Sequence, residues 1–238
     1  MKRYLEPITE NVTRIEDISF AQVKGHQGED LDLKLDIYSP ENDTETNRRV
    51  IIAIHGGGFR NGTKQQEYLV TLCEEFAQLG YVCVSIDYRL YSAENLPGRK
   101  PAAVATAEDV EWARKFLCEN AEKYGIDMTN VALLGGSAGG MTVNEACKNQ
   151  EAGYKAGISL WGGPAEITDP EKYIDIFMAH GTADRTVDYS TSANLLEALT
   201  KVGVHAELIP LEGADHTAIH MRDVFMPRAI EFLNERMN

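Results

Sequence analysis

Cysteine is scarce in this chain, and the few cysteines present form no recognisable set. Cys73, Cys83, Cys118 and Cys147 are scattered, and no two of them stand in a Cys-x-x-Cys pair. A disulfide framework or a structural zinc site needs closely and regularly spaced cysteines. We therefore interpret all four as small hydrophobic residues rather than as bridges or metal ligands.

Positive charge is also in short supply. Lys and Arg number 23 against 37 Asp and Glu, which gives a formal net charge of −14. Nucleic acids and anionic membranes are bound by basic patches, so neither is an expected partner, and a polyanionic substrate is disfavoured. A small-molecule or carbohydrate partner remains. The sequence carries no signal for the oligomeric state.

Long hydrophobic runs are missing as well. No segment approaches the length of a membrane-spanning helix. The N-terminal residues 1–7 include two basic side chains but no apolar stretch of the kind found in signal peptides. The sequence therefore predicts a cytoplasmic location, unless a secretion leader has been removed.

The composition and patterning that are present predict an α/β protein. The 238 residues are 43% hydrophobic and 25% charged, which suits a single domain over residues 1–238. An antiparallel pair of strands opens the chain, and strands then alternate with helices, which predicts an eight-stranded, mostly parallel sheet flanked by helices. Strands are expected at 17–23, 30–38, 50–55, 82–88, 131–135, 156–160, 176–180 and 206–211. Helices are expected at 65–79, 101–124, 138–149, 190–202 and 218–236.

Ser137 stands out as a candidate nucleophile. It occupies the centre of Gly135-Gly136-Ser137-Ala138-Gly139, between an apolar run and a helix-compatible stretch. A sharp strand-to-helix turn needs small residues two positions either side of the serine, because a side chain there would clash across the turn. Such a turn exposes the serine hydroxyl at a helix N-terminus, which favours developing negative charge.

A second glycine-rich turn follows another apolar run, at His55-Gly56-Gly57-Gly58. Backbone N–H groups can approach a substrate oxygen closely where no Cβ intervenes. The N–H groups of Gly57, Gly58 and Ala138 are therefore the predicted oxyanion hole. His55 precedes the serine and is expected to brace this loop rather than to act as a base.

An acid and a base each follow a predicted strand near the C-terminus. Asp184 ends the turn after residues 176–180, and His216 lies in the loop after 206–211. The carboxyl ends of parallel strands meet at one edge of a sheet, so these residues are expected beside Ser137. Asp188 and Asp215 are alternative carboxylates. Asp188 is expected to begin the following helix, and Asp215 to hydrogen-bond locally or to shift the pKa of His216.

These motifs, in this order, resemble the esterase and lipase branch of the α/β-hydrolase fold. The likeness runs from about Asp30 to Phe232 and is nearest to small carboxylesterases and hemicellulose-deacylating esterases. It rests on the segments 55–59, 87–90, 135–140, 180–187 and 213–216. The resemblance implies a Ser137, Asp184 and His216 triad, and no metal or organic cofactor.

The surroundings of the site can also be anticipated. Many similar proteins insert a helical cap, but only residues 161–175 separate the sixth and seventh predicted strands, so a minimal cap or none is expected. Phe59, Tyr91 and Trp161 are the candidates to bind substrate in the open site. Asp87 and Arg89 are expected to brace the loop that carries His55 through charge-assisted hydrogen bonds.

The favoured function is therefore a serine carboxylesterase acting on short-chain acyl esters, including acetyl or feruloyl esters of plant carbohydrate. An arylformamidase-type amidase would use the same residues. A non-catalytic binding protein of this fold is a further alternative, although such proteins usually lose the serine or the histidine. His216 and His220 have zinc-like spacing, but the metalloprotease motif needs Glu where this chain has Thr217.

Overall fold

The computed structural model describes residues 2–237, and its centre is one sheet of eight strands. The strand order is β1-β2-β4-β3-β5-β6-β7-β8. The strands are β1 (Val12–Lys24), β2 (Asp30–Pro40), β3 (Arg48–Ile54), β4 (Val82–Ile86), β5 (Ile126–Gly136), β6 (Ala156–Leu160), β7 (Ile176–Gly181) and β8 (Ala206–Leu211). The β1–β2 and β2–β4 pairs are antiparallel and the others are parallel. The predicted eight-stranded, mostly parallel sheet is confirmed.

Residues 2–237 also form six α-helices and three short 3₁₀ turns, which lie between the strands or after the last one. They are α1 (Glu67–Gln78), α2 (Arg99–Glu119), α3 (Ala121–Tyr124), α4 (Ala138–Ala146), η1 (Gln150–Ala152), η2 (Pro170–Lys172), α5 (Ser190–Lys201), η3 (Ile219–Met221) and α6 (Arg222–Arg236). None of the helices in residues 2–237 combines the length and the apolar character that crossing a bilayer requires.

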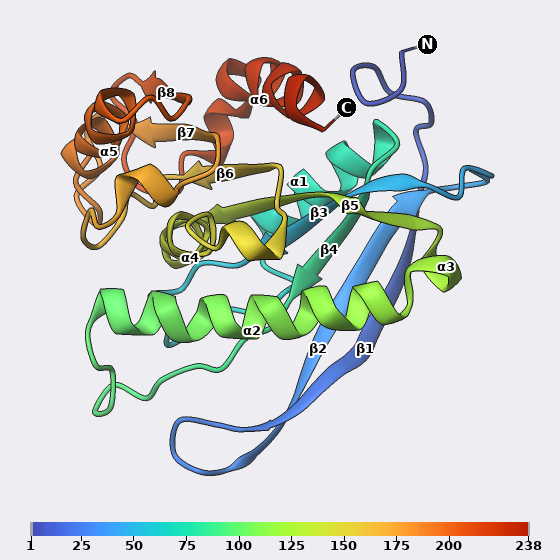
Figure 1. Ribbon diagram of the computed structural model, residues 1–238, viewed down its shortest axis with the longest axis horizontal. Coiled ribbons are helices and arrows are strands. Elements are labelled where there is room, and N and C mark those ends of the chain that lie inside the picture. The colour runs from blue at the N-terminus through green and yellow to red at the C-terminus, as the bar shows by residue number, and fades with distance from the viewer. Residues whose placement is uncertain (1, 238) are drawn as a thin grey trace.

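The helices cover both faces of the sheet and create two apolar layers (Figure 1). Buried side chains of α2, α4 and α5 pack on one face, and those of α1 and α6 pack on the other. The parallel strands supply both layers, since successive residues of β3 alternate between the two clusters. Burial on both faces explains why Val50 to Ile54 read as one continuous apolar run.

Two local features differ from the sequence expectations. The helix expected over 101–124 is interrupted at Asn120, whose side-chain Nδ2 donates to Phe116 O at 2.8 Å, so α3 is a separate turn. A charged side chain is ordinarily exposed, yet Asp36 of β2 is fully buried. Its carboxylate is paired with Arg14 at 2.9 Å and Lys64 at 3.2 Å, which offsets the cost of burying the charge.

The sheet order places the motif-bearing loops together. Ser137 follows β5, Asp184 lies three residues beyond β7, and the loop with His216 follows β8. These strands are parallel members of the run β5-β6-β7-β8, so their carboxyl ends open on the same edge. The loop after β3, the other neighbour of β5, reaches that edge too.

Candidate active site

The turn between β5 and α4 holds Ser137 in a strained backbone conformation. Its φ is 57° and its ψ is −120°, in a region that side-chain-bearing residues rarely adopt. The flanking glycines are required by contact. A Cβ on Gly135 would lie 2.4 Å from Gly139 C and O, and one on Gly139 would lie 2.1 Å from Ile54 O. The turn therefore aims the hydroxyl away from the sheet and leaves it partly exposed at the start of α4.

The structure brings Ser137, His216 and Asp184 into one hydrogen-bonded chain. The hydroxyl Oγ of Ser137 lies 2.8 Å from Nε2 of His216, and Nδ1 of His216 lies 2.7 Å from Oδ2 of Asp184. The side chain of Asp184 is fully buried, while that of His216 is 18% exposed. With Nδ1–H donating to the carboxylate, Nε2 keeps its lone pair and accepts the serine proton, the arrangement that a general base needs.

The carboxylate of Asp184 is held by donors on both oxygens. Its Oδ1 accepts hydrogen bonds from the N–H groups of Thr186 and Val187, at 2.8 and 2.9 Å. Burial acts to raise the pKa of Asp184, but the hydrogen bond from His216 and those two N–H groups outweigh it and hold the pKa below its usual value. Asp184 is therefore an anion at neutral pH.

His180 is a further neighbour of this carboxylate, and no sequence motif indicated the contact. Its Nε2 lies 3.1 Å from Asp184 Oδ2 and 2.9 Å from Val187 O, and its Nδ1 lies 2.8 Å from the hydroxyl of Ser192. Both neighbours of Nε2 are acceptors, so that nitrogen carries the proton and Nδ1 accepts. Burial lowers the pKa of His180, against the opposing pull of Val187 O and Asp184, so the contact is a neutral hydrogen bond rather than an ion pair.

The two alternative carboxylates make other contacts. Asp188 Oδ1 accepts from the N–H of Ser190, the first residue of α5. Asp215 Oδ1 accepts from the N–H groups of Arg185 and His216, both at the rim of the site. Neither carboxylate contacts the imidazole of His216 through a hydrogen bond, so the geometry singles out Asp184.

The glycine turn after β3 presents free backbone donors. Gly57 has a φ of +112°, and a Cβ there would lie 1.9 Å from Asn61 O, so only glycine fits. Within residues 2–237, no hydrogen bond uses the N–H of Gly57, Gly58 or Ala138. Gly58 and Ala138 line the same cavity as Ser137, whereas Gly57 does not.

The loop is braced mainly by uncharged groups. His55 Nδ1 lies 2.6 Å from Gly56 O, and its ring stacks on Tyr88 with centroids 4.2 Å apart. The Tyr88 hydroxyl donates to His55 O at 3.2 Å. Burial lowers the pKa of His55 to about 4, against the pull of Gly56 O. His55 is thus neutral and structural, as expected.

The expectation for Asp87 and Arg89 holds only in part. Asp87 Oδ1 accepts from the N–H of Lys64 at 2.9 Å, farther along the segment that follows His55. Arg89 turns the other way and binds Asp109 of α2 through its Nε at 2.7 Å. Arg89 therefore ties its own loop to α2 instead of bracing the glycine turn. Tyr88, between the two, supplies that brace.

A cavity of about 330 Å³ opens beside Ser137. Apolar side chains of Phe59, Leu96, Met141 and Val187 form much of its wall. Phe59, a predicted substrate-binding residue, lines this cavity but is only 1% exposed, and its role in binding stays a prediction. A pocket of this size suits a small organic group.

The other two candidates for substrate binding lie elsewhere. Trp161 has no exposed surface, and the rings of Tyr68 and Phe225 pack against it at 5.8 and 6.3 Å. The expectation that Trp161 lines an open site is therefore wrong, because its ring points into the core beneath α1 and α6. Tyr91 does not line the cavity beside Ser137, and it stacks on His26 with centroids 3.5 Å apart.

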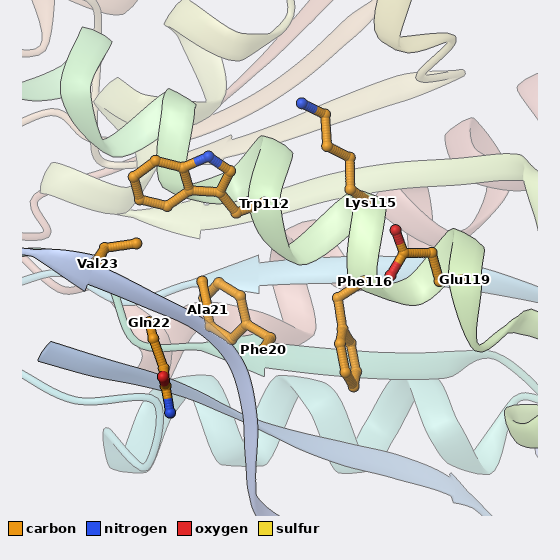
Figure 2. Close-up of a pocket in the computed structure, with 8 residues that line it drawn as sticks. All are labelled: Phe20, Ala21, Gln22, Val23, Trp112, Lys115, Phe116 and Glu119. Carbon is orange, nitrogen blue, oxygen red and sulfur yellow. The ribbon is translucent and has the colours of Figure 1, made fainter.

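A second hollow of similar size lies between the edge strand β1 and helix α2. Figure 2 shows Phe20 and Val23 facing Trp112 and Phe116 across it. None of the three residues Ser137, His216 and Asp184 lines this hollow. His220, the other member of the pair with zinc-like spacing, lines a third hollow with Thr217 and Arg222. The imidazole of His216 instead forms hydrogen bonds with Ser137 and Asp184.

Comparison with known proteins identifies the family of the chain. The BD-FAE family model matches residues 35–153, and the phospholipase/carboxylesterase model matches residues 107–237. The chain belongs to the α/β-hydrolase esterases. The resemblance stated from the motifs is thereby confirmed at the level of the family, and the chain is placed among the serine carboxylic ester hydrolases.

Individual relatives carry the same indication. Human arylacetamide deacetylase-like 2 is 30% identical over 139 residues, which cover 58% of this chain and 31% of that protein. The chain thus spans about a third of that curated relative's length. A thermophilic esterase from Thermogutta terrifontis is 26% identical with a TM-score of 0.73, over 92% of this chain and 91% of its own.

That esterase has been solved in modified and bound forms. The form phosphorylated by paraoxon matches with a TM-score of 0.73 and 26% identity, over 92% of this chain and 93% of its own. The propionate-bound form matches with a TM-score of 0.70 and 26% identity, over 92% of each chain.

Proposed function

We propose that this protein is a serine carboxylesterase that hydrolyses short-chain acyl esters through Ser137, His216 and Asp184. The observation that carries the proposal is the continuous contact from the Ser137 hydroxyl through His216 to the buried Asp184, at 2.8 and 2.7 Å. Ser137 lies at the strained turn directly before α4.

In the first step, His216 Nε2 takes the proton from Ser137 as Oγ attacks the ester carbonyl. The Nδ1–H of His216 stays bound to Asp184, which fixes the tautomer and stabilises the imidazolium. The imidazolium then gives its proton to the departing alcohol. An acyl group remains on Ser137.

The negative oxygen of the tetrahedral intermediate needs donors. The N–H groups of Gly58 and Ala138 border the cavity and have no acceptor within residues 2–237, so they are placed to supply them, with Gly57 as a third candidate. Removing one such donor typically costs about 3 kcal/mol of transition-state stabilisation. Water then attacks the acyl group, with His216 again as base.

The cavity supports a preference for acetyl to butyryl groups. Each methylene removed from water contributes about 0.8 kcal/mol, so an enclosed tunnel would reward long chains steeply. Residues 161–175 between β6 and β7 hold only the short turn η2, so no capping α-helix from this connection encloses the 330 Å³ cavity in that way. The propionate-bound esterase from Thermogutta terrifontis supports the same range. The likeness to carbohydrate-deacylating esterases extends the proposal to acetyl or feruloyl esters of carbohydrate.

A panel of substrates tests the proposal. Specificity constants for nitrophenyl acetate, butyrate and octanoate should peak at or before butyrate, and a matched ester and amide pair should show that the ester is strongly preferred. A maximum at octanoate would contradict the short-chain assignment. A faster amide would favour the arylformamidase-type alternative, and no turnover of any member would favour a binding protein.

A further inference from the structure

The cavity beside Ser137 has a charge opposite to that of the protein. Arg60 and Arg99 both line it, and no Asp or Glu within residues 2–237 does. The chain as a whole has 37 acidic and 23 basic side chains. Among the described residues 2–237, the cavity is thus lined by two arginines and by no acidic residue, although acidic residues outnumber basic ones in the chain.

The two arginines come from different segments of the chain. Arg60 follows the glycine turn after β3, and its N–H donates to Gly57 O. Arg99 is the first residue of α2, and its Nη2 donates to Thr186 O, just beyond Asp184, at 3.4 Å. Both residues are exposed to solvent, and both line the cavity that Ser137 also lines.

Neither Arg60 nor Arg99 forms an ion pair with any residue in 2–237. Most other arginines of the protein do. The paired ones are Arg3, Arg14, Arg89, Arg114, Arg185, Arg222, Arg228 and Arg236, with N–O distances of 2.6 to 3.3 Å. In a protein so rich in carboxylates, two unpaired guanidinium groups in the reactive cavity indicate that their partner arrives with the substrate.

We infer that the natural ester carries a carboxylate a few bonds from the scissile carbonyl, and that Arg60 and Arg99 bind it. The inference rests on the proposed function for the position of the scissile bond. Guanidinium groups suit planar carboxylates because paired N–H donors match both oxygens. Positive charge at the cavity also steers an anionic ester there despite the net charge of −14.

The test compares charged and neutral esters of the same shape. One arm puts the charge on the acyl part, with ethyl hydrogen glutarate against ethyl 4-carbamoylbutanoate. The other arm puts it on the alcohol part, with 4-acetoxybutanoate against 4-acetoxybutanamide. In at least one arm the wild-type specificity constant should favour the anion about tenfold, since each exposed charge pair contributes up to about fivefold. The arm that responds identifies which part of the ester carries the charge.

Variants attribute the selectivity to the two arginines. In R60Q/R99Q the ratio between anionic and neutral ester should fall to within about twofold of unity, and R60K/R99K should retain part of it. The matched control is K24Q/K201Q, which removes the same charge from side chains that are 67% and 70% exposed on β1 and α5. That control should keep the wild-type ratio. Raised salt should lower the ratio in the wild type and in the control, which both keep the two arginines, but not in R60Q/R99Q.

A binding measurement separates this inference from the proposed function. In the Ser137→Ala variant, ligand-observed NMR should detect the anionic ester at lower concentration than its neutral counterpart, and R60Q/R99Q in that background should abolish the difference. If the wild type had equal specificity constants for the anionic and the neutral ester in both arms, the inference would be overturned while the proposed esterase function would stand. Anion binding without turnover of any ester by the wild type would overturn the proposed function while leaving the anion site.

Discussion

Replacing Asp184 by Asn changes a single oxygen at the buried end of the hydrogen-bonded chain. The native carboxylate accepts four hydrogen bonds. His216 Nδ1 and His180 Nε2 donate to Oδ2, and the N–H groups of Thr186 and Val187 donate to Oδ1. An amide offers only one accepting oxygen. If that oxygen keeps the two backbone bonds, the NH₂ group faces His216.

A donor facing Nδ1 forces His216 into the wrong tautomer. Nδ1 must then accept, and Nε2 carries the proton and can no longer take one from Ser137. In triads generally, this exchange lowers kcat by about four decades, which corresponds to about 5 kcal/mol in the activation free energy. We expect that loss in Asp184→Asn, with the fold retained because the backbone hydrogen bonds survive.

Two control variants show whether the loss is specific to Asp184. Asp215→Asn keeps an oxygen for the N–H groups of Arg185 and His216, and Asp188→Asn keeps one for Ser190, so each should lose less than about fivefold. All three kcat values are measured with saturating nitrophenyl acetate, with near-ultraviolet circular dichroism as the folding control. If a folded Asp184→Asn variant kept a tenth of the activity, or if either control variant lost more activity than Asp184→Asn, the assignment of Asp184 as the triad acid would be refuted.

Three further outcomes are expected. His180→Asn should lower kcat about tenfold with little change in KM, because the shorter amide cannot reach Asp184. The longer side chain of His180→Gln should recover part of the rate. Equal rates in the two variants would show that His180 has no positioning role. Because the pKa of His55 falls from 6.5 to about 4 on folding, its contribution to the free energy of unfolding is intact above pH 6.5 and is lost as the pH falls toward 4. The loss amounts to about 3 kcal/mol. Urea titrations should show a shallower pH dependence in His55→Gln than in the wild type. Gly139→Ala should cost at least about 2 kcal/mol by the same titrations, because its Cβ would lie 2.1 Å from Ile54 O, and wild-type stability would contradict that contact.

The parts of the site that depend on the backbone were predictable from the sequence. Gly135, Gly139 and Gly57 stand where any Cβ would overlap main-chain atoms, so the glycine patterns report turn geometry directly. The order of parallel strands then determines which loops meet at the carboxyl edge. That reasoning placed Ser137 and His216 beside each other across 79 residues of sequence.

The orientation of side chains at the edge was not predictable in the same way. Trp161 directly follows β6, where either the core or the cleft could receive its ring. Its φ of 37° and the packing of Tyr68 and Phe225 turn it inward. Such a choice depends on helices that are distant in sequence, so the strand pattern alone could not reveal it.

Contacts between charged or polar side chains were equally hidden. His180 lies within an apolar strand and has no local partner pattern, because its partner Ser192 comes from α5. Arg60 and Arg99 are ordinary surface arginines in the sequence. Their lack of an acidic partner within residues 2–237 becomes visible only once the ion pairs of the folded chain are known.

Labelling with paraoxon tests the central claim most directly, because it reports the activated serine independently of the substrate. Intact-mass and peptide mass spectrometry should find one phosphoryl group per chain, on Ser137, with esterase activity lost in proportion. The Ser137→Ala variant should take up no label and hydrolyse no ester while keeping the wild-type circular dichroism spectrum. Stoichiometric label on another residue, or near wild-type turnover by folded Ser137→Ala, would contradict the account.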